Sequence, residues 1–184
     1  MRVIAGSYRG RKFKSPPDNR TRPTSDRLRE TLFNIIGPSI TPETRFLDLC
    51  AGTGAIGIEA LSRGAGYTGF VEKVRKNCAL IEENLDLLGV PEELTVVECS
   101  DAEKFLRQQR EGAWDFVYFD PPYDSDYAGT LSNLADDSYG ILAENAVVIV
   151  EHHFKNHLVD EMGRLRRWRL LRQGETALSF YESV

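Results

Sequence analysis

The sequence predicts an α/β protein built on a mostly parallel, doubly wound sheet. From residue 45 onward, short apolar runs alternate with longer amphipathic segments, as expected of strands joined by crossover helices. The first apolar run leads into a glycine-rich turn at residues 50–57, which is typical of a strand–turn–helix unit. The last segment breaks the alternation, because two strand-like runs flank Gly174 and predict an antiparallel hairpin.

The spacing of the apolar residues predicts the elements in order. Residues 1–14 predict a short hairpin, followed by a loop at residues 15–23. A helix begins at Thr24 or Ser25, a natural N-cap, and ends at Gly37-Pro38. Strands are then predicted at 45–49, 67–72, 94–98, 114–119 and 146–151. Helices are predicted at 54–63, 75–88, 101–110 and 127–136.

Length and composition indicate one domain with a small appendage. The 184 residues suffice for a hydrophobic core. No apolar run approaches the roughly 20 residues of a membrane span, and the N-terminus lacks the apolar core of a signal peptide, so we expect a cytoplasmic protein. The three cysteines are widely spaced, which favours reduced thiols packed as small apolar groups and argues against a metal site.

Charge is distributed unevenly along the chain. The net charge is −5, yet residues 1–30 hold nine Lys or Arg against three acids, which leaves −11 for the remainder. A second basic cluster lies at residues 164–172. The asymmetry indicates either a localised polyanion-binding surface or a solvated basic tail, and charge alone leaves both open.

The glycine-rich turn and the acids around it predict a nucleotide-like ligand. Gly52, Gly54 and Gly57 match G-x-G-x-x-G, and Glu72 follows at the end of the next strand, where it can accept both hydroxyls of a ribose. Asp48 precedes the glycines, where a carboxylate would repel a pyrophosphate but not a cationic amino acid. Asp101, followed by Ala102, ends the third strand and could accept a hydrogen bond from an adenine amino group. These acids favour S-adenosylmethionine over NAD, and the chain has no room for a dehydrogenase's substrate domain.

The stretch 120–123, Asp-Pro-Pro-Tyr, follows the buried strand at 114–119. Two consecutive prolines cannot continue a sheet ladder, so the strand ends there on an acid. In an open α/β sheet, ligands bind beyond the carboxyl ends of the strands. We therefore expect this acid to face the site. Glu151 ends a later strand and is expected near the same pocket. His152 and His153 are interpreted as ordinary strand-end residues, and Trp168 and Phe180 as core.

Together these motifs resemble a known family. Residues 48–54 are similar to motif I of the class I methyltransferases, and residues 120–123 to motif IV of the amino-methyltransferases. With residues 22–34 and 6–11, the chain resembles the RsmD family, the 16S rRNA (guanine(966)-N(2))-methyltransferases. The resemblance spans nearly the whole chain. It implies a Rossmann-like class I methyltransferase fold, with residues 1–44 as an RNA-binding extension and residues 45–184 as the S-adenosylmethionine-dependent methyltransferase domain.

The residues themselves, together with the resemblance, suggest roles for individual positions. The Asp120 carboxylate and the Pro121 carbonyl would accept hydrogen bonds from the amine of the target guanine, and Tyr123 would stack on the base. The residues expected to contact the donor are Asp48, Gly52, Gly54, Glu72, Asp101, Ala102 and Asp120. The residues expected to contact RNA phosphates are Arg9, Arg11, Arg22 and Arg27. For Arg22 and Arg27, helix capping or an ion pair is the alternative.

The expected substrate is 16S rRNA, within a small-subunit particle, and the expected state is a monomer without a metal. Two alternatives stay open. One is an amino-methyltransferase that acts on adenine N6 or cytosine N4 of DNA or RNA, although no duplex-reading module is visible. The other is a non-catalytic RNA module that binds S-adenosylmethionine, which would be expected to lose Asp120 or Tyr123.

Overall fold

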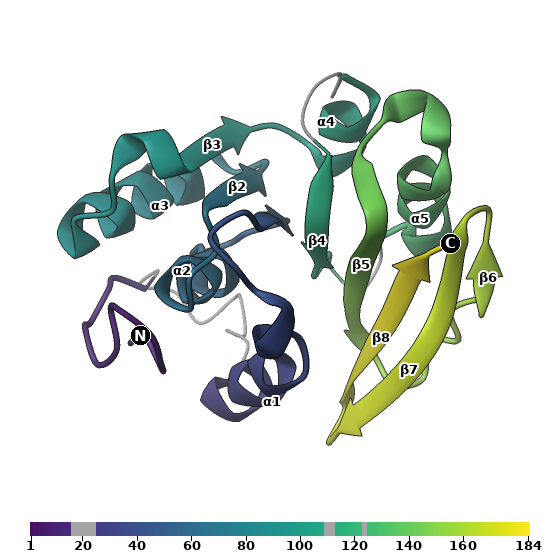
Figure 1. Cartoon of the computed structure of the whole chain (residues 1–184), viewed down its shortest axis with the longest axis horizontal. Helices are drawn as coiled ribbons and strands as arrows, with labels where there is room; N and C mark the ends of the chain where they lie inside the picture. The colour runs from purple at the N-terminus through teal and green to yellow at the C-terminus, as the bar shows by residue number, and fades with distance from the viewer. Residues whose placement is uncertain (16–24, 109–112, 123–124) are drawn as a thin grey trace.

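The computed structural model describes residues 1–15, 25–108, 113–122 and 125–184. Within these ranges the strands form a single eight-stranded sheet in the order β3-β2-β1-β4-β5-β8-β7-β6 (Figure 1). The strands are β1 (Arg45–Leu49), β2 (Tyr67–Glu72), β3 (Thr95–Cys99), β4 (Trp114–Phe119), β5 (Leu142–His153), β6 (Glu161–Met162), β7 (Leu165–Gln173) and β8 (Thr176–Ser183). The first five strands run parallel, and β8, β7 and β6 extend the sheet in antiparallel fashion.

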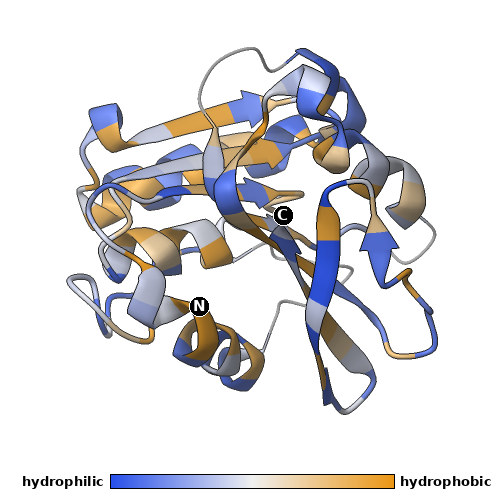
Figure 2. Cartoon of the chain, turned by 45° about the vertical axis from the view of Figure 1, so that its right-hand side comes forward, coloured by the Kyte–Doolittle hydropathy of each residue, from blue (hydrophilic) through white to orange (hydrophobic). Residues whose placement is uncertain are grey.

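Helices cover both faces of the sheet. They are α1 (Asp26–Ile36), α2 (Ala55–Ser62), α3 (Arg75–Leu88), α4 (Ala102–Gln108) and α5 (Tyr127–Ala135), with short 3₁₀ turns η1 (Gly37–Ser39), η2 (Glu92–Leu94) and η3 (Asp137–Tyr139). Along β4, Phe116 and Tyr118 pack toward α1 and α2, whereas Val117 and Phe119 pack toward α4 and α5. Hydrophobic residues accordingly line the central strands (Figure 2).

The order of the strands creates a switch point between β1 and β4. The chain proceeds outward from β1 to β2 and β3, and then crosses back to place β4 on the other side of β1. Leu49 lies beside Val71 on one side and Phe119 on the other, so the carboxyl ends of these strands meet at one edge. In sheets of this kind the ligand binds in the crevice at that edge.

The predicted C-terminal hairpin is confirmed, but the predicted burial of Trp168 is wrong. Phe180 in β8 is fully buried, whereas 44% of Trp168 in β7 is exposed. The pairing of β7 with β8 shifts register between Arg167 and Arg169, which removes Trp168 from the regular ladder. Its ring lies with its centroid 5.5 Å from that of Phe180 and covers it from outside.

The N-terminal residues pack against α2 and α3. The expected hairpin forms through a single antiparallel bridge between Arg2 and Lys12, and it buries Val3 and Phe13. The fully buried Glu59 of α2 accepts hydrogen bonds from the N–H groups of Ile4 at 2.9 Å and Ala5 at 3.0 Å. This buried acid therefore anchors the N-terminal residues to α2.

The three cysteines are free thiols, but they do not share one environment. Cys78 is buried and Cys50 is partly buried. Cys99 is exposed, contrary to the expectation of apolar packing, because β3 is an edge strand of the sheet. His152 is buried in β5 and is hydrogen bonded through Nε2 to the Ser179 hydroxyl at 2.9 Å, consistent with an ordinary strand residue.

In the described part of the chain, no helix has the length and apolar character needed to cross a membrane.

Candidate functional site

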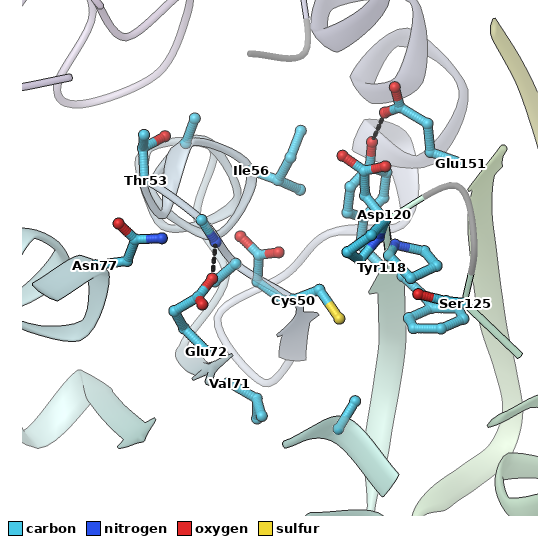
Figure 3. A pocket seen from close by; sticks show the side chains of 18 of the residues that line it. Cys50, Thr53, Ile56, Val71, Glu72, Asn77, Tyr118, Asp120, Ser125 and Glu151 are labelled. Atoms are coloured by element: carbon cyan, nitrogen blue, oxygen red, sulfur yellow. Dashed lines mark hydrogen bonds between the residues drawn. The ribbon is translucent and has the colours of Figure 1, made fainter. Parts of the chain in front are cut away.

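A cavity of about 990 Å³ opens at the carboxyl edge of the parallel strands (Figure 3). The loops after β1, β2, β3 and β4 form one side of it, and the end of β5 adds Glu151. Its lining includes most of the residues predicted for the donor and the base: Asp48, Gly52, Glu72, Asp101, Ala102, Asp120 and Pro121. Residues that are far apart in the sequence thus meet in one place because parallel strands end at one edge.

The loop after β1 is shaped by unusual backbone conformations. Cys50 has a φ of 79°, a left-handed conformation that is strained in a residue with a side chain and that occurs often at functional sites. Gly54 is also left-handed, with a φ of 76°, and is the N-cap of α2. Gly52 lines the cavity, but Gly54 does not. A glycine is favoured at position 54 because the turn requires a left-handed backbone there.

Gly57 allows α2 to approach the sheet closely. A Cβ atom at this position would lie 2.3 Å from the ring of Phe70 in β2. The close approach also lets the Gly57 N–H donate a hydrogen bond of 2.9 Å to Asp48 Oδ2. The acid at the end of β1 is therefore held against the first turn of the helix that follows it.

Asp48 lies in a strongly desolvated position. Only 2% of it is exposed. The pKa of its carboxyl is raised to about 7, mainly by burial and to a smaller extent by the charge of Glu72, while the Gly57 hydrogen bond opposes the rise. A cation that binds beside Asp48 would compensate for the lost hydration and favour the ionised form.

Glu72 organises the loop between β1 and α2. Its Oε2 accepts a hydrogen bond of 2.9 Å from the Gly52 N–H, and its Oε1 accepts one of 2.8 Å from the Val74 N–H. Figure 3 shows this carboxylate on the cavity side of the glycine loop. Since each carboxylate oxygen can accept more than one hydrogen bond, both remain able to bind ligand hydroxyls.

The ends of β3 and β4 supply the next two predicted acids. Asp101 is exposed, and its Oδ1 accepts the Glu103 N–H at 3.0 Å in the first turn of α4. For Asp120, burial foremost, and then the negative charges of Glu151 and Asp48, raise the pKa of the carboxyl well above its ordinary range. Pro121 beside it is buried. Tyr123, the predicted stacking residue, lies outside the described residues.

Tyr118 and Glu151 form a second group at the same edge. The Tyr118 hydroxyl donates a short hydrogen bond to Glu151 Oε2, and Figure 3 shows both side chains beside Asp120. Glu151 lies near the pocket as expected, whereas Tyr118, which is only 1% exposed within β4, was not predicted as a site residue. No local pattern could have identified it, because its partner lies 33 residues away.

Two further segments contribute to the lining of the cavity, and of their residues only Arg27 was assigned a role from the sequence, as a phosphate contact. Ser25, Arg27 and Leu28 at the start of α1 line the cavity, as does the β7–β8 turn, residues 173–176. Thr31 of α1 approaches Gln173 with 3.5 Å between their side-chain oxygens, so the two segments adjoin. The N-cap residue and the turn glycine were visible in the sequence, but only their common location shows that they face the site.

The four predicted phosphate contacts are in different situations. Arg27 lines the cavity, and Arg9 is exposed in the N-terminal hairpin. Arg11 is held against α3, since its guanidinium donates hydrogen bonds to the Leu88 carbonyl at 2.6 Å and the Leu87 carbonyl at 3.1 Å. Arg22 lies outside the described residues.

The sheet order, the terminal antiparallel hairpin and the cavity at the switch point define the class I methyltransferase fold. A solved structure titled "Putative methyltransferase yhhF from Escherichia coli" superposes with a TM-score of 0.88 at 34% identity, covering 100% of this chain and 97% of that one. Residues 1–182 match the family described as "Conserved hypothetical protein 95", and the chain belongs to that family.

Two curated relatives cover nearly all of the chain. One is "Putative rRNA methyltransferase YlbH" of Bacillus subtilis, which is 36% identical over 99% of this chain and 98% of its own length. The other is "Ribosomal RNA small subunit methyltransferase D" of Escherichia coli, which is 36% identical over 99% of this chain and 89% of its own length. The similarity therefore extends through both the N-terminal extension and the sheet.

Proposed function

We propose that this protein transfers a methyl group from S-adenosylmethionine to the exocyclic N2 of a guanine in 16S ribosomal RNA. The observation that carries this proposal is the ring of acids around one cavity, where Asp48, Glu72, Asp101 and Asp120 lie at the ends of four neighbouring strands. The names of the two curated relatives support ribosomal RNA as the substrate. They do not distinguish the guanine target from other bases, which rests on the resemblance to the RsmD family.

The chemistry of the lining fits the donor. Asp48 lies in a desolvated position that a bound cation would compensate, as an amino acid ammonium group would. Glu72 is fixed by two backbone hydrogen bonds in an orientation suited to a ribose diol. Asp101 and Ala102 lie at the end of the next strand, where we assign the adenine. The donor supplies a methyl group on a cationic sulfur, so the protein needs no covalent nucleophile.

The acceptor amine is assigned to the end of β4. Its lone pair is delocalised into the guanine ring, so it is a weak nucleophile. Asp120 and the Pro121 carbonyl would accept hydrogen bonds from the amine hydrogens and orient the nitrogen toward the methyl group. Such positioning is worth up to roughly 7–11 kcal/mol in well-oriented systems. A carboxyl group with a raised pKa still accepts a hydrogen bond through its carbonyl oxygen, so the raised pKa of Asp120 is compatible with this role.

RNA is assigned to the basic residues of the N-terminal hairpin and of the start of α1. Arg9 is exposed on the hairpin, and Arg27 of α1 lines the cavity. Tyr123 is proposed to stack on the target base, which must leave any helix to enter the cavity. We further propose that residues 1–44 act as the RNA-binding extension of the methyltransferase domain, residues 45–184, and that the protein acts as a monomer on a small-subunit particle.

The test is methyl transfer from labelled S-adenosylmethionine to small ribosomal subunits from cells that lack this protein, with the product nucleoside identified by mass spectrometry. N2-methylguanosine at a single site is the expected product. N6-methyladenine or N4-methylcytosine, or label only in DNA, would retain the fold and replace the substrate. Absence of label in any nucleic acid, despite tight donor binding, would favour a non-catalytic module.

A further inference from the structure

Asp120 and Glu151 leave the sheet side by side. The parallel pairing of β4 with β5 matches Tyr118 with Ile149 and Phe119 with Val150. The residues that follow this pair are Asp120, just after β4, and Glu151 in β5, and both line the cavity. Figure 3 shows the two carboxyl groups next to each other, above the end of β4.

Glu151 is held in place by a buried partner. Tyr118, which is only 1% exposed, donates its hydroxyl hydrogen to Glu151 Oε2. Because Tyr118 belongs to the packed core beside α1 and α2, its hydroxyl is a rigid donor. A carboxylate accepts several hydrogen bonds, so this bond is compatible with a second one to a ligand. A hydrogen-bond acceptor is thereby fixed at the part of the cavity where the base is assigned.

Two neighbouring carboxyl groups in a desolvated pocket do not both ionise readily. The pKa of Asp120 is raised well above its ordinary range by burial and by the charge of Glu151. The raised pKa favours the protonated form of Asp120 beside Glu151. The acceptor that Tyr118 holds and the carboxyl group that faces the amine are two separate positions on the cavity wall.

We propose that Glu151 determines the choice of base by accepting a hydrogen bond from the N1–H of guanine while Asp120 faces its N2 amine. This inference rests on the proposed function and adds a residue that selects the base. Guanine presents N1–H and N2–H donors next to each other, which match two neighbouring carboxyl groups. Adenine and cytosine instead present a ring-nitrogen lone pair beside their amine, and this lone pair would meet an acceptor oxygen of Glu151. A site that leaves such a buried polar group without a partner discriminates strongly.

The test reverses the donor and acceptor of one hydrogen bond. The base is changed so that N1 accepts, and the protein is changed so that residue 151 can donate. In 2-aminopurine the N2 amine is kept, but N1 is an acceptor. In Glu151→Gln the side-chain carbonyl can still accept from Tyr118, while the amide can donate to N1 of 2-aminopurine. Small-subunit particles are reconstituted with 16S RNA that carries either guanine or 2-aminopurine at the methylated position. The ratio of kcat/KM for the two particles is then measured for both proteins.

The guanine to 2-aminopurine ratio is expected to fall about 10- to 100-fold in Glu151→Gln. 2-Aminopurine also lacks the O6 atom of guanine. Both proteins act on the same two particles, so the effect of this missing atom cancels when their ratios are compared. Glu144→Gln, an exposed change on the same strand, is the matched control and should keep the wild-type ratio. Binding of S-adenosylhomocysteine should be unaltered in both variants.

The possible failures are distinguishable. If the wild-type protein does not methylate the guanine particle, the proposed function fails. If it does, and Glu151→Gln keeps the wild-type ratio, only the role of Glu151 is overturned. Should Glu151→Gln not bind S-adenosylhomocysteine, Tyr118→Phe is the second test, because it releases the carboxyl group of Glu151 from its fixed orientation and keeps the group itself. The ratio is expected to fall about 3- to 10-fold in that variant, and an unchanged ratio overturns the inference.

Discussion

Glu72 Oε2 accepts a hydrogen bond of 2.9 Å from the Gly52 N–H, which joins the end of β2 to the glycine loop after β1. Its second oxygen accepts the Val74 N–H at the start of α3. One side chain therefore sets the spacing between two loops that line the cavity. The same carboxylate is our candidate for binding the ribose, so the shape of the site and its affinity for the donor depend on one residue.

We expect Glu72→Ala to lower the affinity for S-adenosylhomocysteine about 10- to 100-fold, because it removes the ribose acceptor and releases the Gly52 loop. Isothermal titration calorimetry measures the change. Glu98→Ala is the matched control, since Glu98 is an exposed residue of the neighbouring strand β3. Wild-type affinity in Glu72→Ala would show that the donor does not use the end of β2.

We expect Asp120→Ala to reduce the rate of methyl transfer about 100- to 1000-fold, since it removes an acceptor aimed at the amine. Affinity for S-adenosylhomocysteine should change little, because the predicted donor contacts at β1, β2 and β3 remain. Single-turnover assays and calorimetry measure the two quantities, with the exposed Asp86→Ala of α3 as control. Loss of donor binding would show that Asp120 is needed mainly for the donor and that its proposed role toward the amine is wrong.

The raised pKa of Asp48 makes a prediction about stability. At a pH between the ordinary value for aspartate and about 7, the folded protein holds a proton on Asp48 that the unfolded chain has released. Stability contributed by this group is therefore present at low pH and lost as pH rises to about 7. Asp48→Asn removes the titration and keeps an oxygen that can accept the Gly57 N–H.

In the ligand-free protein, Asp48→Asn should increase the free energy of unfolding at pH 8 by up to about 4 kcal/mol. At pH 4.5 the increase should be about 1 kcal/mol. Urea denaturation at the two pH values measures both. An equal effect at both would mean that Asp48 is ionised in the folded state throughout. The variant should also bind S-adenosylhomocysteine more weakly, because it lacks the charge that faces the ammonium group.

The arginines of the N-terminal hairpin should differ in their effects. Arg9→Glu should weaken RNA binding, reduce its salt dependence and leave the free energy of unfolding unchanged. Arg11→Glu should weaken RNA binding and also destabilise the fold by about 1 kcal/mol, because Arg11 binds two carbonyls of α3. Filter binding over a range of salt concentrations and urea denaturation separate the two effects.

Lys104→Glu is the control for both arginine variants, since Lys104 is exposed on α4, which covers the other face of the sheet. An equal loss of RNA binding in this control would mean that the hairpin arginines affect RNA binding only through the net charge of the protein. A loss confined to the hairpin variants would support residues 1–44 as an RNA-binding extension.

Most elements of the sheet domain follow from local patterns. The predicted strands 45–49, 67–72 and 114–119 and the helix 75–88 have the bounds that the structure shows. Periodicity, caps and breakers act within a few residues, so the chain carries these signals locally. The wrong prediction for Trp168 arises from non-local contacts. Its exposure depends on a register shift between β7 and β8 and on the shortness of β6, which covers little of β7.

Local patterns predict the order of most strands and helices and the four acids at strand ends, because polarity and periodicity are properties of neighbouring residues; the short strand β6 was not predicted. Tertiary packing brings the start of α1 and the turn at residues 173–176 into the lining of the cavity. It alone placed Tyr118 against Glu151, and Glu151 beside Asp120. These relationships depend on the register of strands and the packing of helices, which are set by contacts between distant parts of the chain.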